Sequence, residues 1–335
     1  MGVRRISSGL LAVVLVSACA TSDGSETSDG SETSDELVVV STVSPITNLV
    51  ANVACERVQV VGLVPEGVNS HTFEPAPSDA EILAEADVVF VNGLNLEVPT
   101  VQLAEANVAD GVDIVMLGEE AISPDQYIFD FSFPEEEGDP NPHLWTNPLH
   151  ALAYAELIAD RLIDLDPDGE SEYRANLNRL TERIEMLDMA VRQATATVPA
   201  ENRRLLTYHD SFPYFAREYG WQVIGAIQPS DFSEPSPREV AELIDQIRAE
   251  EVPAIFGSEV FPSPVLERIA AETGARYVDE LRDDDLPGAP GDAEHSYLGL
   301  MVFDFRTMVE TLGGDASAFD GFPTENLCDQ ATYAQ

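Results

Sequence analysis

Short apolar runs rich in β-branched residues alternate with segments of helical periodicity along the first half of the chain. The runs end at turn-forming residues such as Pro65-Glu66-Gly67 and Asn92-Gly93, which is typical of buried strands. The expected strands are at residues 37–43, 58–64, 88–91 and 112–117, and the expected helices are at residues 45–53, from residue 78 onwards, and at 150–165. Strands that alternate with helices predict a mostly parallel sheet.

The second half of the chain repeats this alternation after one long helix. Asp166-Pro167-Asp168-Gly169 breaks the preceding helix, and residues 170–195 then contain no Gly or Pro while their apolar residues recur at helical spacing. Beyond Pro199 the expected strands are 204–207, 222–227, 254–256 and 276–278, and the expected helices are 212–219, 237–250, 263–273 and 297–312. The predicted fold class is α/β, with two Rossmann-like βα lobes joined by one long, rigid α-helix.

Residues 1–36 have a different pattern and contribute nothing to this predicted fold. Arg4 and Arg5 precede an apolar run at residues 10–16 that is too short to span a membrane well, which is typical of a signal peptide. Residues 16–19, Val-Ser-Ala-Cys, resemble a bacterial lipobox, which implies cleavage before Cys19 and a lipid on its sulfur that holds the protein at a membrane. An ordinary signal peptide with a chance cysteine is the alternative. The repeated TSDGSE units that follow predict a disordered, acidic tether.

The expected domains follow from these patterns. They are a signal peptide at 1–18, the lipidated cysteine and tether at 19–36, a first lobe at 37–168, a linking helix at 169–198 and a second lobe at 199–335.

Charge and cysteine content narrow the classes of partner. The net charge is −44, and all 17 basic residues are arginine, so we expect no nucleic-acid binding. Solubility or adaptation to salt explains most of this charge, and some accumulation of cations near the surface is the alternative. Outside the cytoplasm Cys55 and Cys328 are candidates for a disulfide that ties the C-terminal tail to the first lobe, and two unpaired buried thiols are the alternative.

Three of the five histidines lie where ligands bind in α/β folds. His71 and His209 follow predicted strands, and His143 lies in a Pro-rich loop. Ligands bind beyond the carboxyl ends of parallel strands, so these side chains could meet in a cleft between the lobes. A single loop histidine is more often a plain surface residue, and no spacing rule such as HExxH links the three.

A set of motifs in fixed order resembles the metal-binding proteins of zinc and manganese ABC importers, a family with a long helix between its lobes. The motifs are LVPEG at 63–67 with HTFEP at 71–75 and Ser78-Asp79, NGL at 92–94 with Glu97, NPHLW at 141–145, YHDSF at 208–212 with Tyr214-Phe215-Ala216, and YLGLM at 297–301. They extend over about residues 37–315.

The resemblance implies a metal site in the cleft between the lobes. His71, His143 and His209 match three ligands of the family, and the third position is often glutamate in manganese-type members. The fourth ligand is an aspartate before the last helix. Alignment on Leu286 selects Asp284, with Asp283 as the runner-up and Asp285 as the third candidate. Three imidazoles and one carboxylate suit Zn²⁺, and Mn²⁺ is the alternative.

The resemblance also implies a function. We expect an extracytoplasmic, membrane-anchored, monomeric receptor that delivers metal to the permease of an ABC importer and is not an enzyme. A manganese or iron receptor of the same family, a secreted zinc hydrolase with a base such as Glu74, and an adhesin are the alternatives. Zinc-type members often carry a His-rich acidic loop, and here residues 135–139 are acidic without histidine, which predicts a solvated loop or a weak collector of cations. His150 is expected at a helix start, and His295 is expected to be a surface or helix-capping residue.

Overall fold

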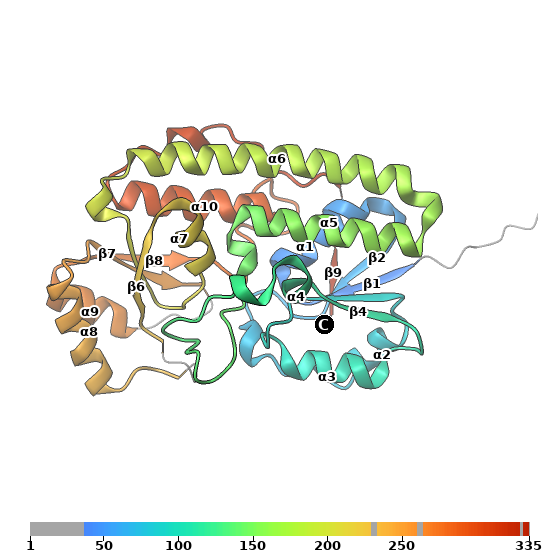
Figure 1. Cartoon of the computed structure of the whole chain (residues 1–335), viewed down its shortest axis with the longest axis horizontal. Coiled ribbons are helices and arrows are strands. Elements are labelled where there is room, and N and C mark those ends of the chain that lie inside the picture. The colour runs from blue at the N-terminus through green and yellow to red at the C-terminus, as the bar shows by residue number, and fades with distance from the viewer. Residues whose placement is uncertain (1–36, 229–232, 260–263, 329–330, 335) are drawn as a thin grey trace, which may run out of the picture. The chain divides into compact units, whose positions relative to one another are not determined.

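The first lobe is built on a parallel sheet with the strand order β4-β3-β1-β2-β9 (Figure 1). The computed structural model describes residues 37–228, 233–259, 264–328 and 331–334, which belong to one compact unit. The signal peptide, Cys19 and the tether lie outside the described residues. The strands are β1 (Val38–Ser41), β2 (Gln59–Gly62), β3 (Val88–Val91), β4 (Asp113–Met116) and β9 (Thr332–Tyr333).

Helices connect the strands of the first lobe and cover its sheet. They are α1 (Ser44–Ala54), α2 (Asp79–Ala84), α3 (Val98–Asn107), α4 (Leu117–Ala121) and α5 (Pro148–Leu165). Every residue of α1 is buried, because this helix packs against α5 and the long helix on one side and against β1 and β2 on the other. The strand order reverses at β1, because β2 pairs with one side of it and β3 with the other. Ligands commonly bind at the carboxyl end of a strand where the order reverses.

The second lobe repeats the parallel arrangement with the strand order β6-β5-β7-β8. Its strands are β5 (Arg204–Thr207), β6 (Gln222–Ala226), β7 (Ala254–Ser258) and β8 (Arg276–Leu281). Its helices are α7 (Pro213–Tyr219), α8 (Pro237–Ala249), α9 (Pro264–Thr273) and α10 (Tyr297–Thr311). The strand order of this lobe reverses at β5. The residues that follow β5 therefore lie where ligands commonly bind, as the residues that follow β1 do in the first lobe.

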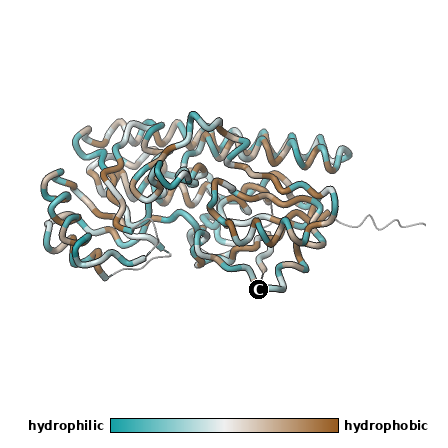
Figure 2. Tube along the Cα trace, turned by 60° about the horizontal axis from the view of Figure 1, so that its bottom comes forward, coloured by the Kyte–Doolittle hydropathy of each residue, from teal (hydrophilic) through white to brown (hydrophobic). Residues whose placement is uncertain are grey.

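The predicted long helix is α6 (Glu170–Thr197), with 28 residues. It packs against α1 and α5 of the first lobe and against α7 and α10 of the second. Its buried face, which includes Leu180, Ile184 and Leu187, belongs to one hydrophobic cluster that also contains Val39 of β1 and Phe256 of β7. Figure 2 shows hydrophobic stretches along the strands and mixed hydropathy along the exposed helices. The two lobes therefore share a core.

Three elements of the first lobe, α3, α4 and β9, were not predicted. The residues of α3 do not segregate into polar and apolar faces, so hydrophobic periodicity gave no signal for it. Strand β9 pairs with β2 through a register that joins Val61 to Thr332, a contact that depends on distant parts of the chain. A disulfide joins Cys55 to Cys328, with their Cα atoms 5.3 Å apart, and lies close to this strand in sequence. Within the described residues, no helix has the length and apolar character needed to cross a membrane.

Candidate metal centre

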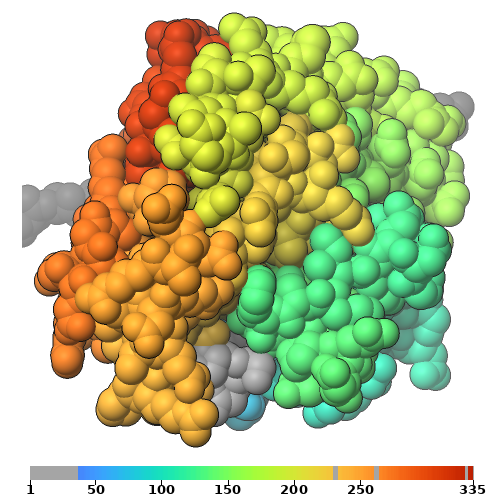
Figure 3. Space-filling model, turned by 60° about the vertical axis from the view of Figure 1, so that its left-hand side comes forward, coloured from blue at the N-terminus to red at the C-terminus, as the bar shows by residue number. Residues whose placement is uncertain are grey.

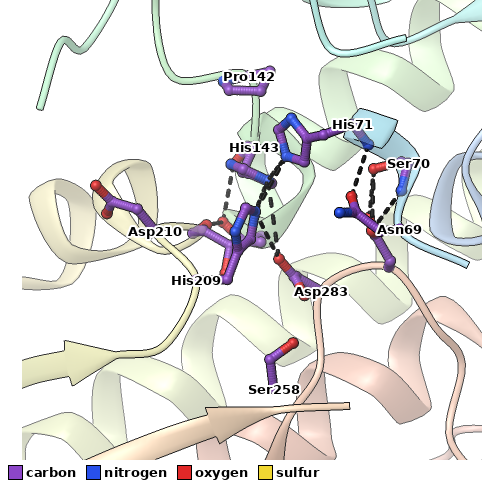
Figure 4. Close-up of polar contacts among 12 residues, drawn as sticks. Asn69, Ser70, His71, Pro142, His143, His209, Asp210, Ser258 and Asp283 are labelled. Carbon is purple, nitrogen blue, oxygen red and sulfur yellow. Dashed lines mark hydrogen bonds and ion pairs between the residues drawn. The ribbon is translucent and has the colours of Figure 1, made fainter. Parts of the chain in front are cut away.

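Three histidine side chains meet between the lobes (Figure 4). His71 lies in a 3₁₀ turn, Ser70–Thr72, after β2; His143 directly precedes a second turn, Leu144–Thr146; His209 follows β5 by two residues. The three Nε2 atoms are 3.0 to 3.1 Å apart. An ion about 2.1 Å from each nitrogen at tetrahedral angles would hold them about 3.4 Å apart, so the observed triangle is slightly smaller than the size required.

Oxygen acceptors on the far side of two rings fix their orientation. Nδ1 of His143 lies 2.9 Å from Oδ1 of Asn141, and Nδ1 of His209 lies 2.8 Å from Oε1 of Gln228. Because these oxygens can only accept, each Nδ1 carries the proton and each Nε2 presents a lone pair to the centre of the cluster. Metal-binding histidines commonly have such partners.

Burial keeps the three imidazoles neutral. It lowers the pKa of His71 and His143 well below the usual value, and a charge on His209 would lower both further. Burial also lowers the pKa of His209, against the opposing effects of Gln228 and Asp284. Neutral imidazole is the form that binds a metal.

Asp283 supplies a carboxylate oxygen to the same space. Its Oδ2 lies 3.5 Å from Nε2 of His209 and 3.9 Å from Nε2 of His143. This oxygen is buried and has no hydrogen-bond partner among the residues that the structure describes. Burial raises the pKa of Asp283 to about 7. Three imidazole nitrogens and one buried carboxylate oxygen thus lie close together, which is an arrangement that a cation fits.

The carboxylates of Asp284 and Asp285 accept hydrogen bonds from the first lobe. The Asp284 carboxylate accepts hydrogen bonds from the backbone N–H of Ser70 at 3.0 Å and from its hydroxyl at 2.9 Å. Asp285 accepts the backbone N–H of Gly67 at 2.7 Å. The alignment on Leu286 selects Asp284, whereas the short distances to His143 and His209 favour Asp283, so the fourth ligand stays a prediction.

The other predicted residues lie elsewhere. His150 packs edge-on against Tyr214, and burial lowers its pKa to about 4. His295 is buried rather than at the surface and forms an ion pair with Glu66 at 3.0 Å. Glu74 and the acidic residues 135–139 are exposed.

Several residues that hold the site were not singled out from the sequence. Asn141 orients His143 and also donates a 2.7 Å hydrogen bond to the backbone oxygen of Asp210. Trp145 donates to the backbone oxygen of Asp283 at 2.9 Å. Asn141 and Trp145 lie on either side of His143 in the motif NPHLW, so the motif could have pointed to them. Gln228 lies 19 residues from His209, and no motif of the sequence marks it. Figure 3 shows first-lobe segments in green against second-lobe segments in yellow and orange.

The comparisons with known proteins agree with this geometry. The family model described as zinc-uptake complex component A, periplasmic, matches residues 39–311. The chain belongs to this family. Members of this family are substrate-binding proteins of ABC transporters and not enzymes. This chain is therefore an extracytoplasmic metal-binding protein.

Relatives and solved structures of the family name more than one metal. The manganese-binding lipoprotein MntA of Halalkalibacterium halodurans is 29% identical over 301 residues, which cover 90% of this chain and 96% of that protein. The periplasmic zinc-binding protein TroA from Treponema pallidum has a TM-score of 0.75 at 29% identity, with 83% of this chain and 99% of that chain covered. A manganese-bound periplasmic protein from Candidatus Liberibacter asiaticus has a TM-score of 0.73 at 27% identity, with coverage of 83% and 100%.

Proposed function

We propose that this chain binds Zn²⁺ through His71, His143, His209 and Asp283 and delivers it to the permease of a cognate ABC importer. The observation that carries the proposal is the meeting of three imidazole Nε2 atoms with Oδ2 of Asp283, a buried oxygen without a hydrogen-bond partner among the described residues. Asp283 is the proposed fourth ligand, instead of Asp284, which the alignment on Leu286 selects.

The donor set supports zinc over manganese. Imidazole nitrogen suits Zn²⁺, while Mn²⁺ prefers oxygen ligands and a higher coordination number, and nitrogen sites generally bind Zn²⁺ more tightly. Relatives and solved structures are named for manganese or for zinc, so similarity alone does not identify the metal. His143 and His209 are at most 3% exposed, which leaves little access for the extra water ligands that Mn²⁺ requires and for an open catalytic position.

Ligands from both lobes mean that the bound metal bridges the lobes. His71 and His143 belong to the first lobe, and His209 and Asp283 to the second. Because the lobes share a core along α6, we infer that release involves small shifts of the ligand loops rather than a wide hinge opening. The proposal also includes lipid attachment at Cys19, a monomeric state, and the division into lobes at 37–168 and 199–335 joined by the helix at 169–198.

Metal analysis and competition test the proposal. Protein purified without added metal is expected to contain zinc, and competition calorimetry is expected to give tighter binding of Zn²⁺ than of Mn²⁺. The substitution His209→Glu should narrow this preference because it exchanges nitrogen for oxygen. His150→Ala serves as the matched control, since it removes a largely buried imidazole outside the cluster. Equal affinity of the wild-type protein for the two ions would overturn the zinc assignment and leave the metal receptor in place.

A further inference from the structure

Two carboxylates of the second lobe hold the backbone of the loop that carries Asp283. Oε1 of Glu259, at the end of β7, accepts the backbone N–H groups of Asp283, Asp284 and Asp285 at 2.8, 3.0 and 3.2 Å. Oδ1 of Asp304, on α10, accepts the N–H of Arg282 at 3.0 Å. Four consecutive N–H groups therefore point at acidic side chains of their own lobe.

This anchoring leaves the side chains of the loop free to make contacts elsewhere. Successive N–H groups that converge on one anion form a concave nest with a defined backbone shape. In this shape Asp283 points to the imidazoles, as Figure 4 shows, while Asp284 bonds to Ser70 of the opposite lobe. The direction of the Asp283 carboxylate is thus tied to the acceptor behind the loop.

The charge of Glu259 does not explain its position. The loop already carries three acidic side chains, and charges of like sign repel one another most strongly where water is excluded. A lysine or arginine would balance the charge of the loop, whereas a fourth acidic side chain does not. The property that suits Glu259 to this place is a single oxygen at the right distance to accept three N–H bonds.

We propose that Glu259 is a positioning residue for metal binding, which fixes the loop so that Oδ2 of Asp283 faces the three imidazoles. The inference rests on the proposed function, because it assigns Asp283 as a ligand. Residues that orient metal ligands commonly affect metal affinity by 10- to 100-fold when they are replaced. Glu259 does not touch the metal position in this account and acts through the backbone of its neighbours.

Two substitutions separate the position of the acceptor from its charge. Glu259→Gln keeps an oxygen at the same distance and removes the charge, while Glu259→Asp keeps the charge and withdraws the oxygen by one methylene. Positioning predicts that Glu259→Asp weakens Zn²⁺ binding by about 10- to 100-fold, and that Glu259→Gln stays close to the wild-type protein. Glu267→Ala is the matched control, because this exposed glutamate lines the same hollow of the second lobe as Glu259.

The visible spectrum of Co²⁺-loaded protein gives a second readout, because its d–d bands report the geometry of the ligands. We expect altered bands for Glu259→Asp and wild-type bands for Glu259→Gln and Glu267→Ala, with all samples fully loaded. A role limited to stability would lower the unfolding temperature and leave these bands unchanged. The inference is overturned if Glu259→Asp binds Zn²⁺ like the wild-type protein, or if Glu259→Gln is the more damaging change. Failure of the wild-type protein itself to bind Zn²⁺ would instead overturn the proposed function.

Discussion

At the scale of single residues, the site is distinguished by one buried carboxylate oxygen that has no hydrogen-bond partner in the part of the chain that the structure describes. Buried polar atoms are nearly always hydrogen-bonded, and Oδ2 of Asp283 departs from that rule next to three imidazole nitrogens. By contrast, Asp284 is satisfied by Ser70. A cation bound by the three imidazoles would also provide a partner for the Asp283 carboxylate. The Asp284 carboxylate already has its partner in Ser70.

This difference predicts unequal effects of two neighbouring substitutions. Asp283→Ala removes a proposed ligand and is expected to weaken Zn²⁺ binding by more than about 100-fold, beyond the usual effect of a residue that only orients ligands. Asp284→Ala removes a partner of Ser70 and is expected to lie within or below that 10- to 100-fold range. Competition titration with a zinc chelator measures both, with His150→Ala as the control. A larger loss for Asp284→Ala than for Asp283→Ala would restore the ligand that the sequence alone selected.

The residues of the site could be predicted only in part. His71, His143 and His209 were accessible because each stands in a distinct motif at a strand end or a Pro-rich loop. The sequence could not separate Asp283, Asp284 and Asp285 as the fourth ligand, because the three residues are chemically identical and consecutive. Their directions depend on hydrogen bonds to Glu259, which is 24 to 26 residues away along the chain.

At the scale of elements, the loop before His71 is bound to the loop before α10. Glu66 of the first loop pairs with buried His295 of the second, and Gly67 donates to Asp285. Burial lowers the pKa of His295, but the hydrogen bond and charge of Glu66 outweigh it, so the pKa is raised above the usual value. This contact joins the two lobes on one side of the metal site.

The raised pKa of His295 gives a pH dependence with a definite sign. A histidine with a higher pKa in the folded than in the unfolded state adds stability that is complete below about pH 6.5 and is lost as pH rises through the folded value. Glu66→Gln should therefore lower the free energy of unfolding by about 1.5–3 kcal/mol near pH 5.5, the range of hydrogen bonds to charged groups. The cost should shrink at pH 8 or above. Urea unfolding of metal-free protein at a series of pH values measures it, and a cost that grows with pH would contradict the assignment.

Prediction of the elements succeeded where local pattern determines them. The helix α6 follows from 28 residues without Gly or Pro and with regular apolar spacing. The strand β9 and its neighbour Cys328 depend on partners far away in sequence, Val61 and Cys55. The pairing of β9 with β2 arises from the closure of the whole first lobe and has no local signal. The disulfide was predicted and is confirmed, because Cys55 and Cys328 are the only two cysteines after Cys19 in the sequence.

At the scale of the whole molecule, the dominant property is the net charge of −44 with arginine as the sole basic residue besides histidine. Many of the ion pairs that the structure describes join arginine to an acidic residue one helical turn away, and such exposed pairs contribute little stability. Most acidic groups therefore repel one another. The same field attracts cations, so the charge opposes the folded state and favours the approach of the metal.

Because the negative charge both destabilises the folded state and attracts metal ions, added salt should stabilise the protein and slow metal binding. Added NaCl should raise the unfolding midpoint of the metal-free protein, because it screens repulsion within the compact state. It should also slow the association of Zn²⁺, because it screens the attraction that raises the encounter rate. Thermal unfolding and stopped-flow capture of Zn²⁺ measure the two effects. Most of each change is expected below about 0.15 M, where the Debye length has fallen from about 30 Å at 0.01 M to about 8 Å. A midpoint that falls with salt, or a capture rate that does not respond, would show that the charge acts only on solubility.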